Sequence, residues 1–197
     1  MSTQTLLPNR DCETCDVCCI VPSIDVSDIQ KASSARCVHC TEGCAIYETR
    51  PAVCRDYFCG WRRLPAIPQD WRPDKCGVLT ELTTVDISPS RQATGIVLTL
   101  IANPLKTVRA PWFSAFVART IAANTPVFLA LPGPTGHMPA RIMLNGQAMN
   151  EALRRSQGRV KECLEIALAA LKAHTFVEQT LDFKGNDATG DPWTQRL

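Results

Sequence analysis

The sequence lacks the features of several large classes of protein. Its longest apolar run, Gly95–Ala102, is far shorter than the roughly 20 residues that a membrane-spanning helix needs. The opening stretch MSTQTLLPNR has no basic segment followed by an apolar one, so we expect no secretory signal. These absences predict a soluble, cytoplasmic protein with no membrane partner.

Charge and conventional catalytic motifs are also sparse. The net charge is +2 at pH 7, which gives no indication of the basic face that nucleic-acid binding requires. The glycines form neither GxxxxGK[ST] nor GxGxxG, which argues against a nucleotide site. GxSxG and HExxH motifs are absent as well. His137 and His174 lie far from the cysteines in sequence, and we expect them to be surface or packing residues.

Cysteine is the residue type that the chain has in excess. Nine of the eleven cysteines lie between residues 12 and 59, with the spacings CxxCxxCC, CxxCx3C and Cx4C. Thiolates are soft ligands for zinc, copper(I) or the iron of an iron–sulfur cluster, and a two-residue spacing lets neighbouring thiolates face one metal. We therefore predict a zinc or iron–sulfur site, since spacing alone does not separate these two. The predicted ligands are Cys12, Cys15, Cys18, Cys19, Cys37, Cys40, Cys44, Cys54 and Cys59.

Two other uses of clustered cysteines fit this sequence less well than metal binding. A disulfide framework belongs to oxidising compartments. The absence of a signal, the odd cysteine count and the adjacency of Cys18 and Cys19 argue against it. A thioredoxin-like redox pair needs two cysteines at a helix start, fewer than this cluster contains. Four-coordinate sites take cysteines in fours, so eight of the nine would fill two centres or one polynuclear cluster.

Several residues around the cluster have two possible roles. His39 could ligate metal through nitrogen, but a histidine between cysteines is as often a donor to sulfur. Cys76 and Cys163 are more simply small buried thiols. Arg50 and Arg55, with the acidic residues Glu48 and Asp56, either form an ion-pair lattice that fixes the cysteine turns or provide an anion anchor beside an open metal position.

Residue patterns predict an α+β fold made of two parts. A cysteine-rich, metal-stapled lobe at 1–76 would pack on a small mixed or antiparallel sheet at 77–197 that has helices on one face. An S-x-x-Q capping box predicts a short helix at 27–35 in the first part, and Pro51 a helical turn that carries Cys54. Trp61 and Trp71 are expected to cover either the cysteine cluster or the junction between the two parts. For the second part we predict strands at 78–87, 94–102, 127–131 and 141–144 and helices at 111–124 and 147–174.

The cysteine pattern and its neighbours resemble a known family. The chain has Cys12-x2-Cys15-x2-Cys18-Cys19, then GCxIYExRP at 43–51, CRxYxC at 54–59 and WRPD at 71–74. This combination is similar to the YkgJ-like cysteine-cluster proteins, whose CxxCxxCC domain is described as zinc- or iron-chelating. The matching segment runs from Cys12 to about Asp74, roughly a third of the chain.

The resemblance implies metal chelation with no defined reaction. It implies eight ligands, matching Cys40 less well and leaving Cys76 outside: Cys12, Cys15, Cys18, Cys19, Cys37, Cys44, Cys54 and Cys59. Flagellin lysine N-methylases carry a similar cluster, which suggests an alternative, a metal-dependent redox or methyl-transfer enzyme. The glycine loop of an S-adenosylmethionine site is absent from the sequence. The partners that this interpretation predicts are metal ions, and a protein partner stays open.

Overall fold

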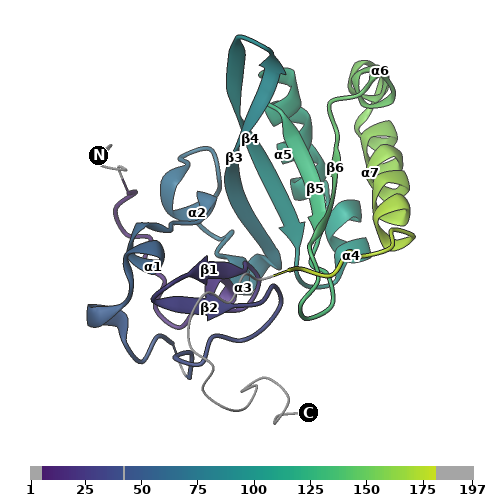
Figure 1. Cartoon of the computed structure of the whole chain (residues 1–197). Coiled ribbons are helices and arrows are strands. Elements are labelled where there is room, and N and C mark those ends of the chain that lie inside the picture. The colour runs from purple at the N-terminus through teal and green to yellow at the C-terminus, as the bar shows by residue number, and fades with distance from the viewer. Residues whose placement is uncertain (1–5, 42, 181–197) are drawn as a thin grey trace.

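The computed structural model describes residues 6–41 and 43–180, and its architecture is α+β, as predicted (Figure 1). The stretch Cys12–Cys59, called here the cysteine segment, is built from short elements. They are the 3-10 helices η1 (Val17–Cys19) and η2 (Tyr47–Thr49), the strands β1 (Ile24–Val26) and β2 (Ile29–Lys31), and the helix α1 (Ala52–Asp56). Two further short helices, α2 (Gly60–Arg63) and α3 (Pro73–Cys76), connect this segment to the rest of the chain.

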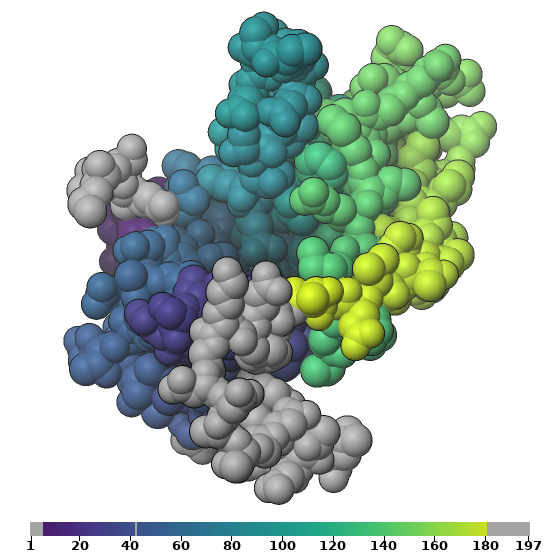
Figure 2. Space-filling model, in the orientation of Figure 1, coloured from purple at the N-terminus to yellow at the C-terminus, as the bar shows by residue number. Residues whose placement is uncertain are grey.

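A four-stranded mixed sheet follows. Its strands are β3 (Val78–Ser88), β4 (Arg91–Leu100), β5 (Val127–Leu131) and β6 (Ala140–Met143), and they lie side by side in that order. The pairs β3–β4 and β5–β6 are antiparallel, whereas β4 and β5 are parallel. The parallel pair needs a crossover, which contains α4 (Pro104–Arg109) and α5 (Pro111–Ala122). β4 pairs with β5 only over Ile96–Thr99, so the far end of the β3–β4 hairpin extends beyond β5 and forms a projection of the molecule (Figure 2).

The main hydrophobic core lies between this sheet and the helices α5 and α7 (Gln157–Lys172), which lie on one side of it (Figure 1). Leu98 and Leu129 from the sheet are fully buried there, as are Phe113 from α5 and Leu164 from α7. Trp61 and Trp71 also belong to this core, and Trp71 stacks on Phe113 with ring centroids 6.4 Å apart. The connection between the cysteine segment and the sheet is therefore part of the main core.

Strand alternation points two β3 side chains toward the cysteine segment. Val78 faces the main core, whereas Leu79 and Glu81 lie on the opposite side of the strand and reach cavities in the cysteine segment. α2 packs closely along the strand edge. A Cβ atom at Gly60 would lie 2.7 Å from Cγ2 of Thr80, so a side chain at Gly60 would force the two elements apart.

The prediction of a helix at 27–35 is wrong, because this stretch contains a turn and the strand β2. β1 and β2 pair antiparallel, with Val26 opposite Ile29, and Ser27 and Asp28 form the turn between them. The Ser27 hydroxyl donates to the Asp28 carboxylate at 3.0 Å and does not cap a helix. Apolar residues that alternate along a short segment favour a strand pair, and this preference outweighs a four-residue capping pattern.

The prediction of one continuous helix at 147–174 is also wrong, because this stretch forms two helices. α6 (Gln147–Arg155) ends at Ser156, whose backbone is extended, and α7 starts directly afterwards. The Ser156 hydroxyl accepts a hydrogen bond from the Arg159 backbone N–H, which is the N-cap arrangement of a new helix. The other predicted strands and the helix at 111–124 are present with small shifts at their ends. None of the helices in the described ranges combines the length and the apolar character needed to cross a bilayer.

Candidate metal centre

Most of the clustered cysteines line one cavity. Its volume is about 370 Å³, and seven thiol-bearing residues form part of its wall: Cys12, Cys15, Cys18, Cys19, Cys37, Cys44 and Cys54. Cys59 lines a smaller adjoining cavity of about 30 Å³, which it shares with Cys12, Cys15 and Cys18. The fold thus brings together the eight cysteines to which the family resemblance assigns chelation.

Tight backbone turns position these cysteines. The Cys15 N–H donates to the Cys12 carbonyl at 2.7 Å, which closes the first turn. The Cys37 N–H donates to the Cys19 carbonyl at 2.8 Å and joins two stretches that are distant in sequence. Gly43 has a φ of +121°, a backbone conformation that favours glycine, immediately before Cys44. The Cys54 N–H donates to the carbonyl of Pro51, and this turn starts α1 as predicted.

The other cysteines lie apart from the cavity. Cys40 is buried, and its sulfur accepts a hydrogen bond from the Arg36 guanidinium at 3.1 Å. Cys76 is partly buried against the main core, and burial raises the pKa of its thiol to about 11. Cys163 packs partly buried on α7. All eleven cysteines are free thiols. Of the nine predicted ligands, Cys40 is the one that does not face either thiol-lined cavity.

Within residues 6–41 and 43–180, no three His, Cys, Asp or Glu side chains already form a group able to hold a metal ion. The thiols share a cavity without converging on one point. His39 lines the same cavity, so its position is compatible with either of its two predicted roles.

The adjacent thiols of Cys18 and Cys19 share a hydrogen bond, and this bond shifts their pKa values in opposite directions. This bond lowers the pKa of Cys19 to about 6, and together with burial it raises the pKa of Cys18. The pair therefore loses its first proton near neutral pH and retains the second. A thiolate is the form that both attacks electrophiles and binds metals, and within this pair Cys19 is the residue that carries it.

Lys31 places a positive charge beside these thiols. Its side chain is almost completely buried, and the ammonium donates to the main-chain carbonyls of Ile20 at 2.8 Å, Ala35 at 3.0 Å, Ala32 at 3.2 Å and also Pro22. Burial lowers the pKa of Lys31 to about 8, and the nearby thiols, first among them Cys37 and Cys19, oppose this shift. Sequence reasoning did not single out Lys31, because an isolated lysine carries no signal of burial.

The predicted ion-pair lattice around Arg50 and Arg55 does not form among the described residues. Instead, the Arg50 guanidinium lies 3.8 Å from the centroid of the Tyr47 ring, and Arg50 lines the cavity. Arg55, Glu48 and Asp56 are exposed at the surface. Short-range sequence proximity of opposite charges does not ensure contact, because solvated side chains on tight turns project away from one another.

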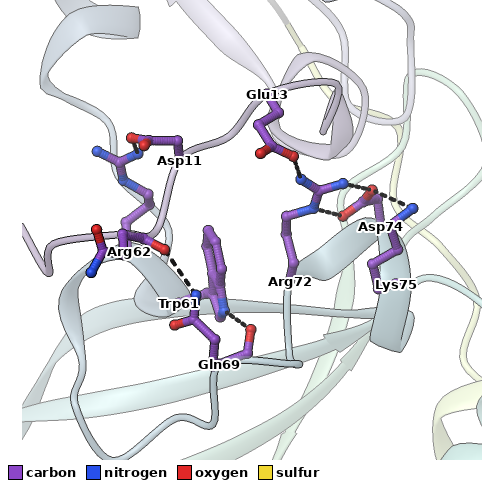
Figure 3. A network of polar contacts seen from close by, with 9 residues as sticks. Asp11, Glu13, Trp61, Arg62, Gln69, Arg72, Asp74 and Lys75 are labelled. Atoms are coloured by element: carbon purple, nitrogen blue, oxygen red, sulfur yellow. Dashed lines mark hydrogen bonds and ion pairs between the residues drawn. The ribbon is translucent and has the colours of Figure 1, made fainter.

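The ion pairs that do fix the cysteine segment come from further along the chain. Arg72 binds both Glu13 and the Asp74 carboxylate, the latter at 2.8 Å, and Arg62 binds Asp11 at 2.9 Å (Figure 3). The side chains of Arg62 and Arg72 are mostly buried. These contacts attach the turn that carries Cys12 to α2 and α3.

A partly buried tyrosine–carboxylate pair forms part of the cavity wall. The Tyr57 hydroxyl donates to Glu81 Oε1 at 2.8 Å, and both residues line the thiol cavity. Burial raises the pKa of Glu81, an effect that the bond from Tyr57 partly offsets. Burial and the neighbouring Glu81 charge raise the pKa of Tyr57 as well. Sequence reasoning missed Glu81, because a strand edge that contacts a cavity cannot be recognised before the two parts are docked.

Comparison of the chain with protein-family models, with curated proteins and with solved structures found no match. The resemblance to the cysteine-cluster family therefore rests on the cysteine spacing and the residues around it.

Proposed function

We propose that this protein is a metal-chelating cysteine-cluster protein that binds zinc or an iron–sulfur centre in a reducing, cytoplasmic environment. The observation that carries this proposal is that seven cysteines line one cavity, with an eighth on the cavity beside it. A wall of thiols suits soft or borderline metals, and its composition matches neither the oxygen-rich sites of calcium and magnesium nor a hydrophobic core.

The residues around the thiols fit such a centre. A divalent ion bound by four thiolates carries a net charge of about −2, which a buried site must offset. Lys31 is buried next to Cys19 and Cys37, and Arg62 lies on the walls of both cavities. Without the metal, no complete metal site exists among the described residues, so binding would draw the thiols inward and stabilise the segment.

Metal and acid-labile sulfide measured per chain test the proposal directly. Protein purified without air should contain one of the two metals, and sulfide if the metal is iron. Absorption in the visible range would identify an iron–sulfur centre, since zinc is colourless. A folded protein that holds no metal as isolated, and that takes up neither zinc nor iron and sulfide when these are supplied, would refute it.

A metal-dependent enzyme of the redox or methyl-transfer class is the second candidate. The observation in its favour is that the larger cavity, at about 370 Å³, has the size of a small-ligand pocket and presents Glu81 and Arg50 beside the thiols. A closed thiolate centre would leave part of this space free for a substrate.

Substitution of Arg50 separates the two candidates. Arg50→Met keeps much of the side-chain volume and removes the charge that faces the cavity. A pure chelating module should show no functional loss beyond any change in metal content or stability. Arg50→Met protein that keeps full metal and full stability while losing a cellular phenotype would favour the enzyme. Arg55→Met, at an exposed position, is the matched control.

A further inference from the structure

The eight cavity-lining cysteines divide into two sets of four. The first set is defined by the smaller cavity, whose wall contains Cys12, Cys15, Cys18 and Cys59. Electrostatic contacts within this set agree, because Cys59 and Cys15 each interact with Cys12, and Cys18 interacts with both Cys12 and Cys15. A volume of about 30 Å³ is roughly that of one water molecule, which leaves room for a single ion.

The second set consists of the four cysteines that line the larger cavity alone, Cys19, Cys37, Cys44 and Cys54. Cys54 interacts electrostatically with Cys37, Cys19 and Cys44. The backbone bond from the Cys37 N–H to the Cys19 carbonyl holds two of these residues side by side. The described residues on the wall of the smaller cavity include none of these four.

Cys18 and Cys19 form the boundary between the sets. They are adjacent in sequence and share a hydrogen bond across the boundary. Beyond that bond, Cys18 interacts with Cys12 and Cys15, whereas Cys19 interacts with Cys40 and Lys31. Consecutive cysteines can in this way serve two neighbouring sites joined by one peptide bond. Cys40 lies at the edge of the second set, where its thiol is hydrogen-bonded to Cys19 and to the Arg36 guanidinium, and it does not line the cavity.

On the basis of the chelating function proposed above, we infer that the cysteine segment forms two separate four-thiolate metal sites, site one from Cys12, Cys15, Cys18 and Cys59 and site two from Cys19, Cys37, Cys44 and Cys54. This division uses all eight thiols and satisfies the four-coordinate preference of thiolate-bound zinc twice. It leaves Cys40 as a structural thiol. Site one joins the first and last cysteines of the segment, whereas site two joins its interior turns.

A positive side chain lies beside each inferred site, and both cations reach the boundary between the sites, since Lys31 also interacts with Cys18 and Arg62 lines both cavities. Arg62 interacts with Cys59 of site one, and its guanidinium is mostly buried. Lys31 interacts most strongly with Cys37 and Cys19 of site two. Two centres that each carry about −2 would repel one another at short range, and cations beside them reduce that cost.

Metal stoichiometry with one substitution per set tests the division. Full-length protein is loaded with Zn²⁺ alone under reducing conditions, and bound zinc and circular dichroism are measured after desalting. The wild type should bind two Zn²⁺ per chain. Cys59→Ser and Cys54→Ser should each bind one, the double variant none, and the control Cys40→Ser two. Cys12→Ser and Cys44→Ser repeat the measurement at each site, should one of the first pair fail to fold.

The outcomes distinguish this inference from the function on which it rests. Wild-type protein that takes up no zinc, iron or sulfide removes the chelating function and the two sites together. Wild-type protein that binds metal but loses all of it in either folded single variant retains the function and overturns the division, since all eight thiols would then hold one cluster. A loss of zinc in folded Cys40→Ser also overturns it, because that cysteine would then be a ligand.

Discussion

A single buried residue, Lys31, joins the stretches of the cysteine segment that precede and follow the β1–β2 hairpin. The Lys31 ammonium binds carbonyls on both sides of the β1–β2 hairpin, Ile20 and Pro22 before it and Ala32 and Ala35 after it. Those stretches lead directly to Cys19 and Cys37. The charge beside the thiols and the geometry of the turns therefore depend on the same side chain.

Lys31→Met should lower the free energy of unfolding by about 2 kcal/mol, because it leaves buried carbonyl groups without their donor. It should also weaken metal binding, since the positive charge beside the thiolates is lost. Urea denaturation and competition with a chelator measure the two effects. Lys75→Met is the control, because Lys75 has a side chain that is 67% exposed and should change stability by no more than about 0.5 kcal/mol. Equal stability of Lys31→Met and wild type would contradict the role of this ammonium.

Glu81 should give the protein a pH-dependent loss of stability. Burial holds its folded pKa above the ordinary value of 4.5, so the folded state binds more protons than the unfolded state between these two values. Stability should therefore fall as pH rises through that window, and Glu81→Gln should remove this contribution while leaving an acceptor for Tyr57. The measurement is the difference in unfolding free energy between wild type and Glu81→Gln as pH rises from about 4 to about 7. A difference that stays constant with pH would show that Glu81 does not titrate abnormally.

Helices and strands could be predicted from the sequence wherever the periodic spacing of apolar residues continued over many positions. The β3–β4 hairpin, β5 and α5 were found because their apolar residues repeat at strand or helix spacing over long stretches. The β1–β2 hairpin was missed because three-residue strands give too short a pattern. The break at Ser156 was missed because apolar spacing continues across it, and α4 was missed because a six-residue helix carries little periodic signal.

The cysteines of the candidate site could be predicted from the sequence, whereas the residues that surround them could not. Cysteine spacing indicated nine residues, and eight of them line the cavities, whereas the ninth, Cys40, does not. Lys31, Tyr57 and Glu81 join the site through tertiary packing, and nothing in their sequence neighbours indicates it. Whether the thiols bind metal stays a prediction.

The N-cap of α7 gives an element-scale test of the divided helix. Ser156→Ala should destabilise the protein by about 1 kcal/mol, because the Arg159 N–H loses its side-chain acceptor. Ser156→Gly should cost only a few tenths of a kcal/mol, since glycine is tolerated at N-caps. Thermal or urea unfolding of the two variants measures the contrast. An alanine variant as stable as wild type would indicate a continuous helix through residue 156.

The whole molecule is held together partly by its C-terminal described residues. Gln179 Oε1 accepts a hydrogen bond from the Ser33 N–H at 3.0 Å, and the Gln179 N–H donates to the Gly136 carbonyl at 2.7 Å. Ser33 lies just after β2, in the cysteine segment, whereas Gly136 lies between β5 and β6. One residue therefore connects the cysteine segment to a loop of the sheet.

Gln179→Ala should loosen this connection. Removing the acceptor leaves the buried Ser33 N–H unpaired and should cost about 1 kcal/mol. Limited proteolysis should then cut faster near residues 32–36 than in wild type. Gln179→Glu keeps an oxygen acceptor at the same reach and should preserve most of the protection. Identical cleavage rates in Gln179→Ala and wild type would show that the contact does not contribute to docking.

Removal of metal should separate the stability of the cysteine segment from that of the sheet. The segment has only a small core of its own, formed by Ile29, Cys37 and Cys40 with partly buried neighbours, so thiol–metal bonds would supply much of its order. Trp61, Ile67 and Trp71 belong to the main core and do not depend on the metal. Treatment with a chelator should therefore raise amide hydrogen exchange across residues 12–59 while residues 60–76 and the sheet keep their protection. Exchange that rises equally through β4, β5 and α7 would mean that the metal stabilises the whole molecule as one cooperative unit. Unchanged exchange across 12–59, in protein shown to have lost its metal, would mean that the segment folds on its ion pairs and turns alone.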